Sequence, residues 1–268
     1  MNFTFNELLL AYRKAKVDKY YSSHASLINW AAYEEHLYDN LNSLLSRING
    51  DSDDWINDLG FLGGWKLVPK KLDMPTDHAD GFVYGSASAR WEHLINSKKK
   101  DKRIEAQFRL MAECTVDFHV LSTLWIMKVG EKFDNLLSNN SYGNRLRRDK
   151  NGAFNPLSLG SFKPYLQPFQ NWRDNGIRSV QNAIENNKQV VALTTDISSF
   201  YHELDARFIL RKSFTEHLGK SFSLTADEEK LNKLFIHSVE NWANKTPSKK
   251  GLPVGLPCLV YTSPSPRD

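Results

Sequence analysis

The chain has 268 residues, of which 41% are hydrophobic and 25% are charged. These proportions are those of an ordinary globular protein, and they exclude a disordered, collagen-like or disulfide-scaffold chain. Lysine and arginine outnumber aspartate and glutamate by 35 to 31, so the net charge is +4. A charge this small permits a nucleic-acid or phosphate partner without arguing for one.

Compartment and membrane signals are weak along the whole sequence. The two cysteines, Cys114 and Cys258, are too few for a disulfide framework. The N-terminus has no basic segment followed by a long apolar run, so it does not resemble a signal peptide. The most apolar stretch, Val120–Val129, is too short for a bilayer, which takes about 20 apolar residues. We expect a cytoplasmic protein that makes no contact with a membrane.

The first half of the chain has mainly helical periodicity. Apolar residues three and four positions apart predict helices over 5–12, 28–48 and 104–137. Asn49-Gly50 is expected to end the second of these helices. The many glycines and prolines that follow predict loops with one short strand near Trp65–Val68.

Two polar features of this half admit two interpretations each. A basic cluster is either a solvated loop and helix start or a contact for a phosphate backbone; it comprises Lys98, Lys99, Lys100, Lys102 and Arg103. His119 lies in the apolar part of the third helix, with no second histidine three or four positions away. We therefore interpret it as a hydrogen-bonded core residue rather than a zinc ligand.

The composition changes after Asn139, and the second half is predicted to mix loop, helix and strand. Asparagine, serine, glycine and proline are frequent as far as Pro164, which predicts a long loop or hairpin region. A helix is predicted over 169–186. The β-branched run at 189–195 predicts a buried strand that leads into Asp196.

Two segments of this half contain residues suited to chemistry. A carboxylate at the end of a strand, such as Asp196, is well placed to bind a metal ion because the strand fixes its backbone. It is equally well placed to cap a helix that begins near Ser198. Two glycines and two prolines at 251–257 predict a stiff loop with exposed backbone that could lie against a base pair or sugar. Alone, that loop is better explained as a linker.

Together and in this order, the two segments resemble the palm of a reverse transcriptase. Residues 195–205 (TDISSFYHELD) resemble the family's first catalytic motif, an aspartate followed five positions later by an aromatic residue. Residues 251–255 (GLPVG) resemble its template- and nucleotide-positioning loop. The upstream segments 162–165 and 172–174 resemble elements of bacterial reverse transcriptases linked to phage defence, a group near the retron, group II intron and abortive-infection enzymes.

The resemblance covers roughly residues 140–257 and implies an α+β fold. A helical N-terminal extension would be followed by a partial fingers and palm, with helices packed on an incomplete antiparallel sheet. The expected organisation is therefore a helical N-terminal or fingers extension, a partial fingers and palm, and a non-native tail, at 1–138, 139–257 and 258–268.

The resemblance also implies a metal centre and a nucleotide site. Asp196 would be a shared ligand of two Mg²⁺ ions, and the carbonyl of Ile197 a further ligand. Tyr201 would be the steric gate that rejects a ribose 2′-hydroxyl and so selects dNTPs. Core packing is an equally good explanation of that tyrosine.

Backbone and arginine contacts complete the implied site. Gly255 would let the backbone approach the nucleotide and template, and Gly251 and Pro253 would help to position the template. Val254 stands where many relatives have glutamine, so a polar contact there is absent or replaced. The candidates for binding the triphosphate, for which surface salt bridging is an equal alternative, are Arg145 and Arg147.

The implied function is RNA-directed DNA polymerisation, in which dNTPs are added to a primer 3′-hydroxyl by a two-Mg²⁺ mechanism. The partners would be an RNA template, a DNA primer and product, and dNTPs, and the role would be antiviral defence. A partner protein or non-coding RNA is not identified. The alternatives are a non-catalytic nucleic-acid-binding protein on a polymerase-like scaffold, and an unrelated helical protein in which Asp196 is only a cap.

The C-terminal segment 258–268 (CLVYTSPSPRD) resembles translated sequencing adapter rather than protein. We expect the native sequence to end near Pro257, inside the positioning loop. The further acids of the family, usually a Tyr-x-Asp-Asp on a hairpin, are not in the sequence. One carboxylate cannot hold two Mg²⁺ ions in octahedral geometry, so we expect residues 1–268 to lack polymerase activity that the parent protein has.

Overall fold

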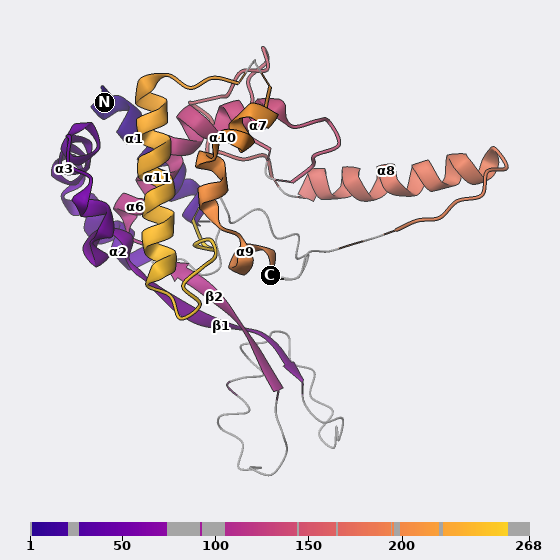
Figure 1. Ribbon diagram of the computed structural model, residues 1–268, viewed down its shortest axis with the longest axis horizontal. Coiled ribbons are helices and arrows are strands. Elements are labelled where there is room, and N and C mark those ends of the chain that lie inside the picture. Colours follow the sequence, from indigo (N-terminus) through magenta and orange to yellow (C-terminus); the bar gives the residue numbers. More distant parts are fainter. Residues whose placement is uncertain are drawn as a thin grey trace, which may run out of the picture.

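The computed structural model describes residues 2–20, 27–73, 92, 105–143, 145–164, 166–193, 195, 199–219 and 222–256. This part of the chain combines helices with one two-stranded antiparallel sheet, as expected for a mixed α and β protein. Most helices form one body, from which a β-ribbon and a long helix, α8, extend in different directions (Figure 1).

Helix α1 (Phe5–Tyr20) confirms the first predicted helix and runs eight residues beyond it. The second predicted helix is divided in two, α2 (Leu27–Glu35) and α3 (Leu37–Asn49), with the break at His36. Helix α3 ends at Asn49, as the Asn-Gly pair predicted. Helix α3 packs against α1, and its fully buried residues are Leu41, Leu44 and Ile48.

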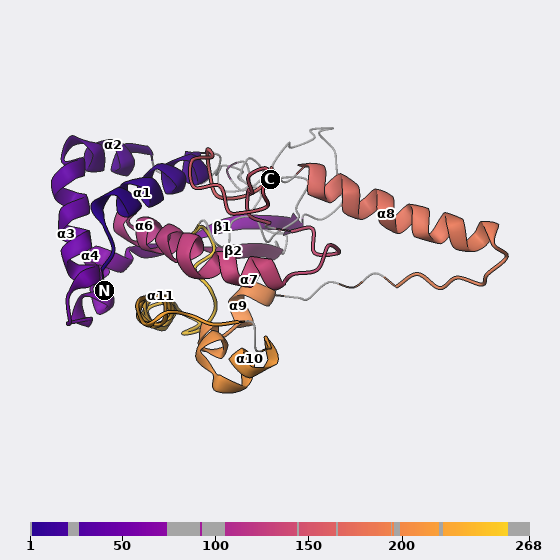
Figure 2. The ribbon, with the colours of Figure 1, turned by 90° about the horizontal axis from the view of Figure 1, so that it is seen from above.

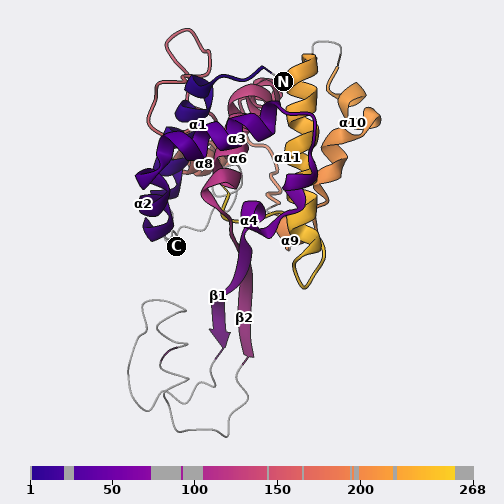
Figure 3. The ribbon, with the colours of Figure 1, turned by 90° about the vertical axis from the view of Figure 1, so that its left-hand side faces the viewer.

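The β-ribbon pairs β1 (Gly64–Asp73) with β2 (Glu105–Glu113), and it projects from the helical body in Figure 3. A turn of 3₁₀ helix, η1 (Asp54–Asn57), and a short helix, α4 (Leu59–Leu62), precede it. Strand β1 confirms the short strand predicted there and is longer than expected. The helix predicted from residue 104 is wrong over β2, where apolar Phe108, Leu110 and Ala112 alternate with other residues at the period of a strand.

The centre of the fold is α6 (Val116–Trp125), which continues through a π-helical turn, η2 (Ile126–Gly130), into α7 (Glu131–Leu136). His119 lies on α6 and is 1% exposed, which confirms its place in the core. Neither of its ring nitrogens has a hydrogen-bond partner among the described residues, so the predicted hydrogen bond is wrong for that part of the chain. Burial lowers the pKa of this imidazole well below its usual range, which keeps it neutral.

Helix α8 (Leu166–Glu185) confirms the helix predicted near 169–186, and it points away from the body in Figure 2. None of its side chains is buried. After it come α9 (Phe200–Glu203), η3 (Ala206–Leu210) and α10 (Lys212–His217). Of these, η3 packs against α11, and α10 packs against η3.

Helix α11 (Ala226–Asn244) packs against α6 and joins the two halves of the chain in one core. The indole N–H of Trp125 donates to Asn232 Oδ1 at 2.9 Å, and the rings of Trp125 and Phe235 lie 4.8 Å apart. The core therefore includes residues from both sides of the boundary predicted at residue 138. The long loop predicted before Pro164 is confirmed, with isolated bridges that pair Leu146 with Phe162 and Arg148 with Phe154.

Candidate functional site

The loop at 251–256, which follows α11, is buried along its whole length. Main-chain hydrogen bonds hold it from two sides. The N–H of Leu252 donates to the carbonyl of Tyr201 on α9 at 2.7 Å. The N–H of Ala112 on β2 donates to the carbonyl of Val254, also at 2.7 Å. The loop thus connects α9 with the base of the β-ribbon.

Gly251 and Gly255 have φ angles of +95° and +124°, which L-residues rarely adopt. A Cβ at Gly251 would lie 2.8 Å from the carbonyl oxygen of His202. A Cβ at Gly255 would lie 3.0 Å from the carbonyl oxygen of Ala112. The sharply turned loop expected from the sequence is therefore present, but the prediction that its backbone is exposed is wrong, because the loop is buried against the backbone of α9 and β2.

Tyr201, the expected steric gate, lies on α9 and is half-buried. Its ring meets Phe200 edge-on, with centroids 5.2 Å apart, and it packs on the edge of the core. Ser199 begins this short helix in a left-handed conformation, with φ +54°. The carbonyl of Tyr201 is occupied by the loop, so the two segments that carry the family resemblance are in direct contact.

The expected metal ligands Asp196 and Ile197 lie outside the described residues. The strand predicted to end at Asp196 is wrong for residues 189–193 and 195, which are not in a strand. Val191 and Leu193 are 96% and 86% exposed. A β-segment needs a hydrogen-bonded neighbour, and among the described residues β1 and β2 pair only with each other. The interpretation of Asp196 as a helix cap is therefore left open.

The first two carboxylates that follow Asp196 in the sequence are already paired. Glu203 forms an ion pair with Lys250 of the loop. Asp205 accepts from Arg207, and this guanidinium lowers the pKa of the carboxyl group. Within the described ranges, no three histidine, cysteine, aspartate or glutamate side chains are grouped in a way that could hold a metal ion.

Arg145 and Arg147, the expected triphosphate ligands, bind the protein itself. Arg145 donates from Nε to Asp134 Oδ1 at 2.9 Å and from its terminal nitrogens to three main-chain carbonyls. Arg147 donates from Nε to the carbonyl of Phe162 at 2.7 Å. Arg148, which the sequence did not single out, binds the second oxygen of Asp134. The bonds to Asp134 fasten the loop at 145–163 to the end of α7, and the bond from Arg147 to Phe162 lies within the loop.

Helix α1 fastens the same loop from its other side. The ammonium group of Lys14 donates to the carbonyls of Asn155, Ser158 and Gly160 at 2.9–3.1 Å. The carboxylate of Asp18 accepts from the N–H of Ser161. Burial is the main cause of both pKa shifts, to about 8 for Lys14 and to about 6 for Asp18. The sequence carried no signal that Lys14 and Asp18 bind this loop, because both residues lie at ordinary helical positions.

Several other predictions concern residues that the structure does not describe, namely the basic cluster at 98–103 and the tail at 258–268. Across the described helices, none is long and apolar enough to cross a membrane. Comparison of the chain with known protein families, with characterised proteins and with solved structures finds no match.

Proposed function

We propose that this chain is the fingers-and-palm part of an RNA-directed DNA polymerase. The single observation that supports the proposal best is the 2.7 Å hydrogen bond from Leu252 to Tyr201. It joins the two segments that resemble the family's first catalytic motif and its positioning loop. Nothing in the order of these segments along the chain requires them to touch, so their contact is evidence independent of the resemblance.

In this proposal Asp196 and the carbonyl of Ile197 hold Mg²⁺ ahead of α9. The bound Mg²⁺ would favour ionisation of the primer 3′-hydroxyl and neutralise charge on the triphosphate. Tyr201, at the junction of α9 and the loop, contacts the sugar of the incoming nucleotide. The template lies along the loop at Gly251, Pro253 and Val254, and because these residues are buried, the segments that cover them would have to move aside. Antiviral defence is the biological role that accompanies this activity.

The triphosphate contact is the least supported part of the proposal. The side-chain donors of Arg145 are bound to Asp134 and to main-chain carbonyls. Binding a triphosphate there would require these bonds to be exchanged. The terminal nitrogens of Arg147 are the better candidates, since its hydrogen bond to Phe162 uses only Nε.

The proposal is tested by a binding measurement that needs no catalysis. A fluorescent DNA primer with a dideoxy end is annealed to an RNA template, and its affinity for residues 1–268 is measured by anisotropy in Mg²⁺. We expect the dNTP that pairs with the next template base to tighten the complex at least about tenfold, and a mispaired dNTP to leave it unchanged. The pairing dNTP should lose its effect in Asp196→Asn, whereas Asp174→Asn, on the exposed helix α8, should behave as wild type.

Two results would contradict the polymerase assignment. Tight binding of the primer–template with no dependence on the next nucleotide would favour the non-catalytic nucleic-acid-binding protein. Absence of binding at micromolar protein would favour the other alternative, an unrelated helical protein in which Asp196 only caps a helix. In either case Asp196→Asn would match wild type.

A further inference from the structure

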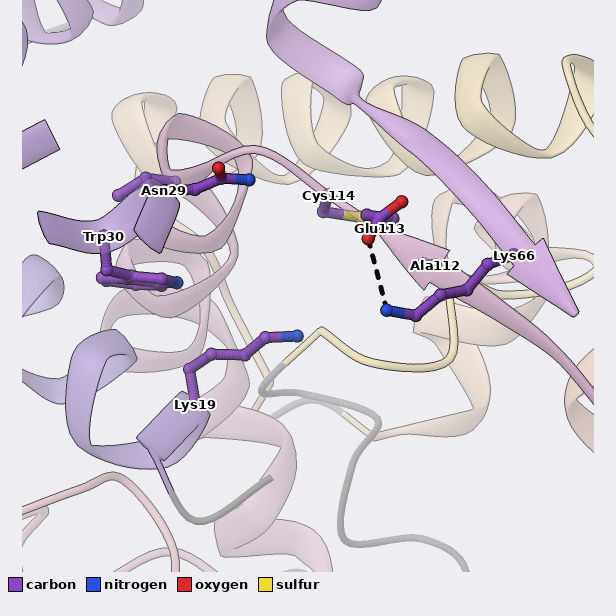
Figure 4. Close-up of a pocket in the computed structure, with 8 residues that line it drawn as sticks. Lys19, Asn29, Trp30, Lys66, Ala112, Glu113 and Cys114 are labelled. Carbon is purple, nitrogen blue, oxygen red and sulfur yellow. Dashed lines mark hydrogen bonds and ion pairs between the residues drawn. The ribbon is translucent and has the colours of Figure 1, made fainter. Parts of the chain in front are cut away.

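The asparagine–glycine pairs of this chain can undergo a reaction that needs no binding cavity. The pocket drawn in Figure 4, where the end of α1, the start of α2 and the base of the β-ribbon meet, has a volume of about 20 Å³. That is room for about one water molecule and not for a larger ligand. Asparagine followed by glycine, in contrast, reacts with its own main chain. The sequence has three such pairs, at 49–50, 151–152 and 175–176, and the structure holds each of them differently.

The reaction is deamidation through a cyclic imide. The main-chain nitrogen of the glycine attacks Cγ of the asparagine, the bond from Cγ to Nδ2 breaks, and ammonia leaves with the proton of the glycine N–H. Water then opens the resulting succinimide at one of its two carbonyls. One opening gives aspartate, and the other gives isoaspartate, in which the main chain runs through the side-chain carbon. Glycine favours the attack because no side chain stands beside its nitrogen and its backbone turns freely.

Two of the three pairs are held in helices by both side chain and main chain. The side chain of Asn49, at the end of α3, accepts from the N–H of Phe3 at 3.0 Å and donates to its carbonyl at 2.8 Å. Asn175 lies inside α8, and its amide donates to the hydroxyl of Tyr142 at 2.8 Å. The N–H of the following Gly176 belongs to the hydrogen bonds of that helix. Both pairs must break these bonds before the glycine nitrogen can reach Cγ.

Asn151 lies in an exposed turn of the loop at 145–163. Among the described residues, no hydrogen bond holds its side-chain amide. The N–H of Gly152 donates to the carbonyl of Asp149 at 3.1 Å. The carboxylate of Asp149 accepts from the N–H of Asn151 at 2.8 Å and from that of Ala153 at 3.0 Å. An exposed turn closed by so few bonds opens more readily than a helix, so the reacting atoms of this pair can meet most often.

We propose that Asn151 is a site of spontaneous deamidation, and that its conversion to isoaspartate opens the turn at 149–153. Arg148 donates to the carbonyl of Gly152 at 3.0 Å and also binds Asp134 of α7, so this turn is fastened to the helical body. Isoaspartate lengthens the main chain by one carbon, which moves the Gly152 carbonyl relative to Arg148. The proposal involves none of the residues proposed for the nucleotide site, and it holds whether or not the chain is a polymerase.

The test is to age the full chain at physiological temperature and mildly alkaline pH, where the glycine N–H ionises more readily. Peptide mapping by mass spectrometry follows the three pairs, and an isoaspartyl methyltransferase identifies isoaspartate. In the folded chain we expect Asn151 to react at least about tenfold faster than Asn49 and Asn175. In concentrated urea the three rates should become similar, because each asparagine is followed by glycine. Equal rates in the folded chain, or a difference that persists in urea, would overturn the proposal.

Two matched substitutions identify the reacting residue. Asn151→Gln should remove most of the isoaspartate that wild type forms, because the larger ring that glutamine requires closes slowly. Asn175→Gln alters the pair inside α8 and should remove almost none. Both asparagines are exposed, so both variants keep the fold. Isoaspartate that forms in Asn151→Gln as fast as in wild type would overturn the assignment.

Amide hydrogen exchange measures the opening of the turn. The N–H of Asp149 donates to the carbonyl of Ala153 at 2.8 Å, and that of Asn155 donates to the carbonyl of Arg147 at 3.0 Å. In aged chains that carry isoaspartate, both amides should exchange at least about tenfold faster than in fresh protein, with α11 unchanged. Asn151→Asp keeps the normal main chain and should exchange like fresh wild type. The proposal is overturned if aged chains exchange like fresh ones, or if Asn151→Asp exchanges like aged ones.

Discussion

Asp18 places a carboxyl group against the buried end of the loop at 155–161, where it accepts from the N–H of Ser161. Its pKa is raised from 3.8 to about 6 in the folded chain, chiefly by burial. The folded state therefore binds a proton more readily than the unfolded state between these two values. Stability attributable to Asp18 is fully present below about pH 4 and is lost as the pH rises to about 6.

Asp18→Asn should remove this loss, because asparagine still offers an oxygen to Ser161 but does not titrate. The difference in free energy of unfolding between the variant and wild type should rise by up to about 3 kcal/mol between pH 4 and 6.5, in favour of the variant, and then stay level. Urea denaturation at several pH values measures it. Asp39→Asn, on the exposed face of α3, should show no such gain. Parallel wild-type and Asp18→Asn curves would contradict the account.

Gly251 is the residue at which the loop depends most on the absence of a side chain. Gly251→Ala should lower the free energy of unfolding by about 2 kcal/mol or more, since φ is +95° and the new Cβ would lie 2.8 Å from His202 O. Gly143→Ala is the matched control, because no atom lies within 4 Å of its added Cβ. Equal urea midpoints for the two variants would show that the close approach is absent.

At the scale of elements, predictions succeeded where the periodic pattern was long and internally consistent. Helices α1 and α8 both have such a pattern. Strand β2 was missed because Met111 interrupts the alternation of Phe108, Leu110 and Ala112 with polar residues. Helix α11 was not predicted, although Thr225 and Glu228 form a capping box before its apolar face. The strand at 189–195 failed for a different reason, since apolar β-branched residues form a strand only beside a partner.

Helix α8 is stabilised by its own backbone more than by packing, because none of its side chains is buried. Gly176→Ala in its interior should slow amide hydrogen exchange in α8 about three- to fivefold, the factor expected for replacing glycine by alanine in an exposed helix. Peptides from α11 serve as the internal reference and should exchange as before. Unchanged exchange in α8, or slowing of α8 and α11 together, would mean that α8 does not open independently.

At the scale of the whole molecule, the candidate site depends on contacts far apart in sequence. The loop at 251–256 is held by α9 and by β2, and the loop at 145–163 by α1 and α7. The resemblance identified α9 and the loop at 251–256 as functional segments, but neither periodicity nor spacing could indicate that they touch. Nor could they show that Arg145 is bound to Asp134, because such a pairing arises only when distant elements pack.

The central claim is that α9 and the loop at 251–256 form one nucleotide site, with Tyr201 against the sugar. It is tested most directly by comparing dNTP with rNTP in the primer–template complex described above. In wild type and in Tyr201→Phe, which keeps the ring, the pairing dNTP should tighten the complex at least about tenfold more than the matching rNTP. In Tyr201→Val this preference should fall to near unity, with primer–template affinity unchanged. An unaltered preference in Tyr201→Val, or none in wild type, would contradict the claim.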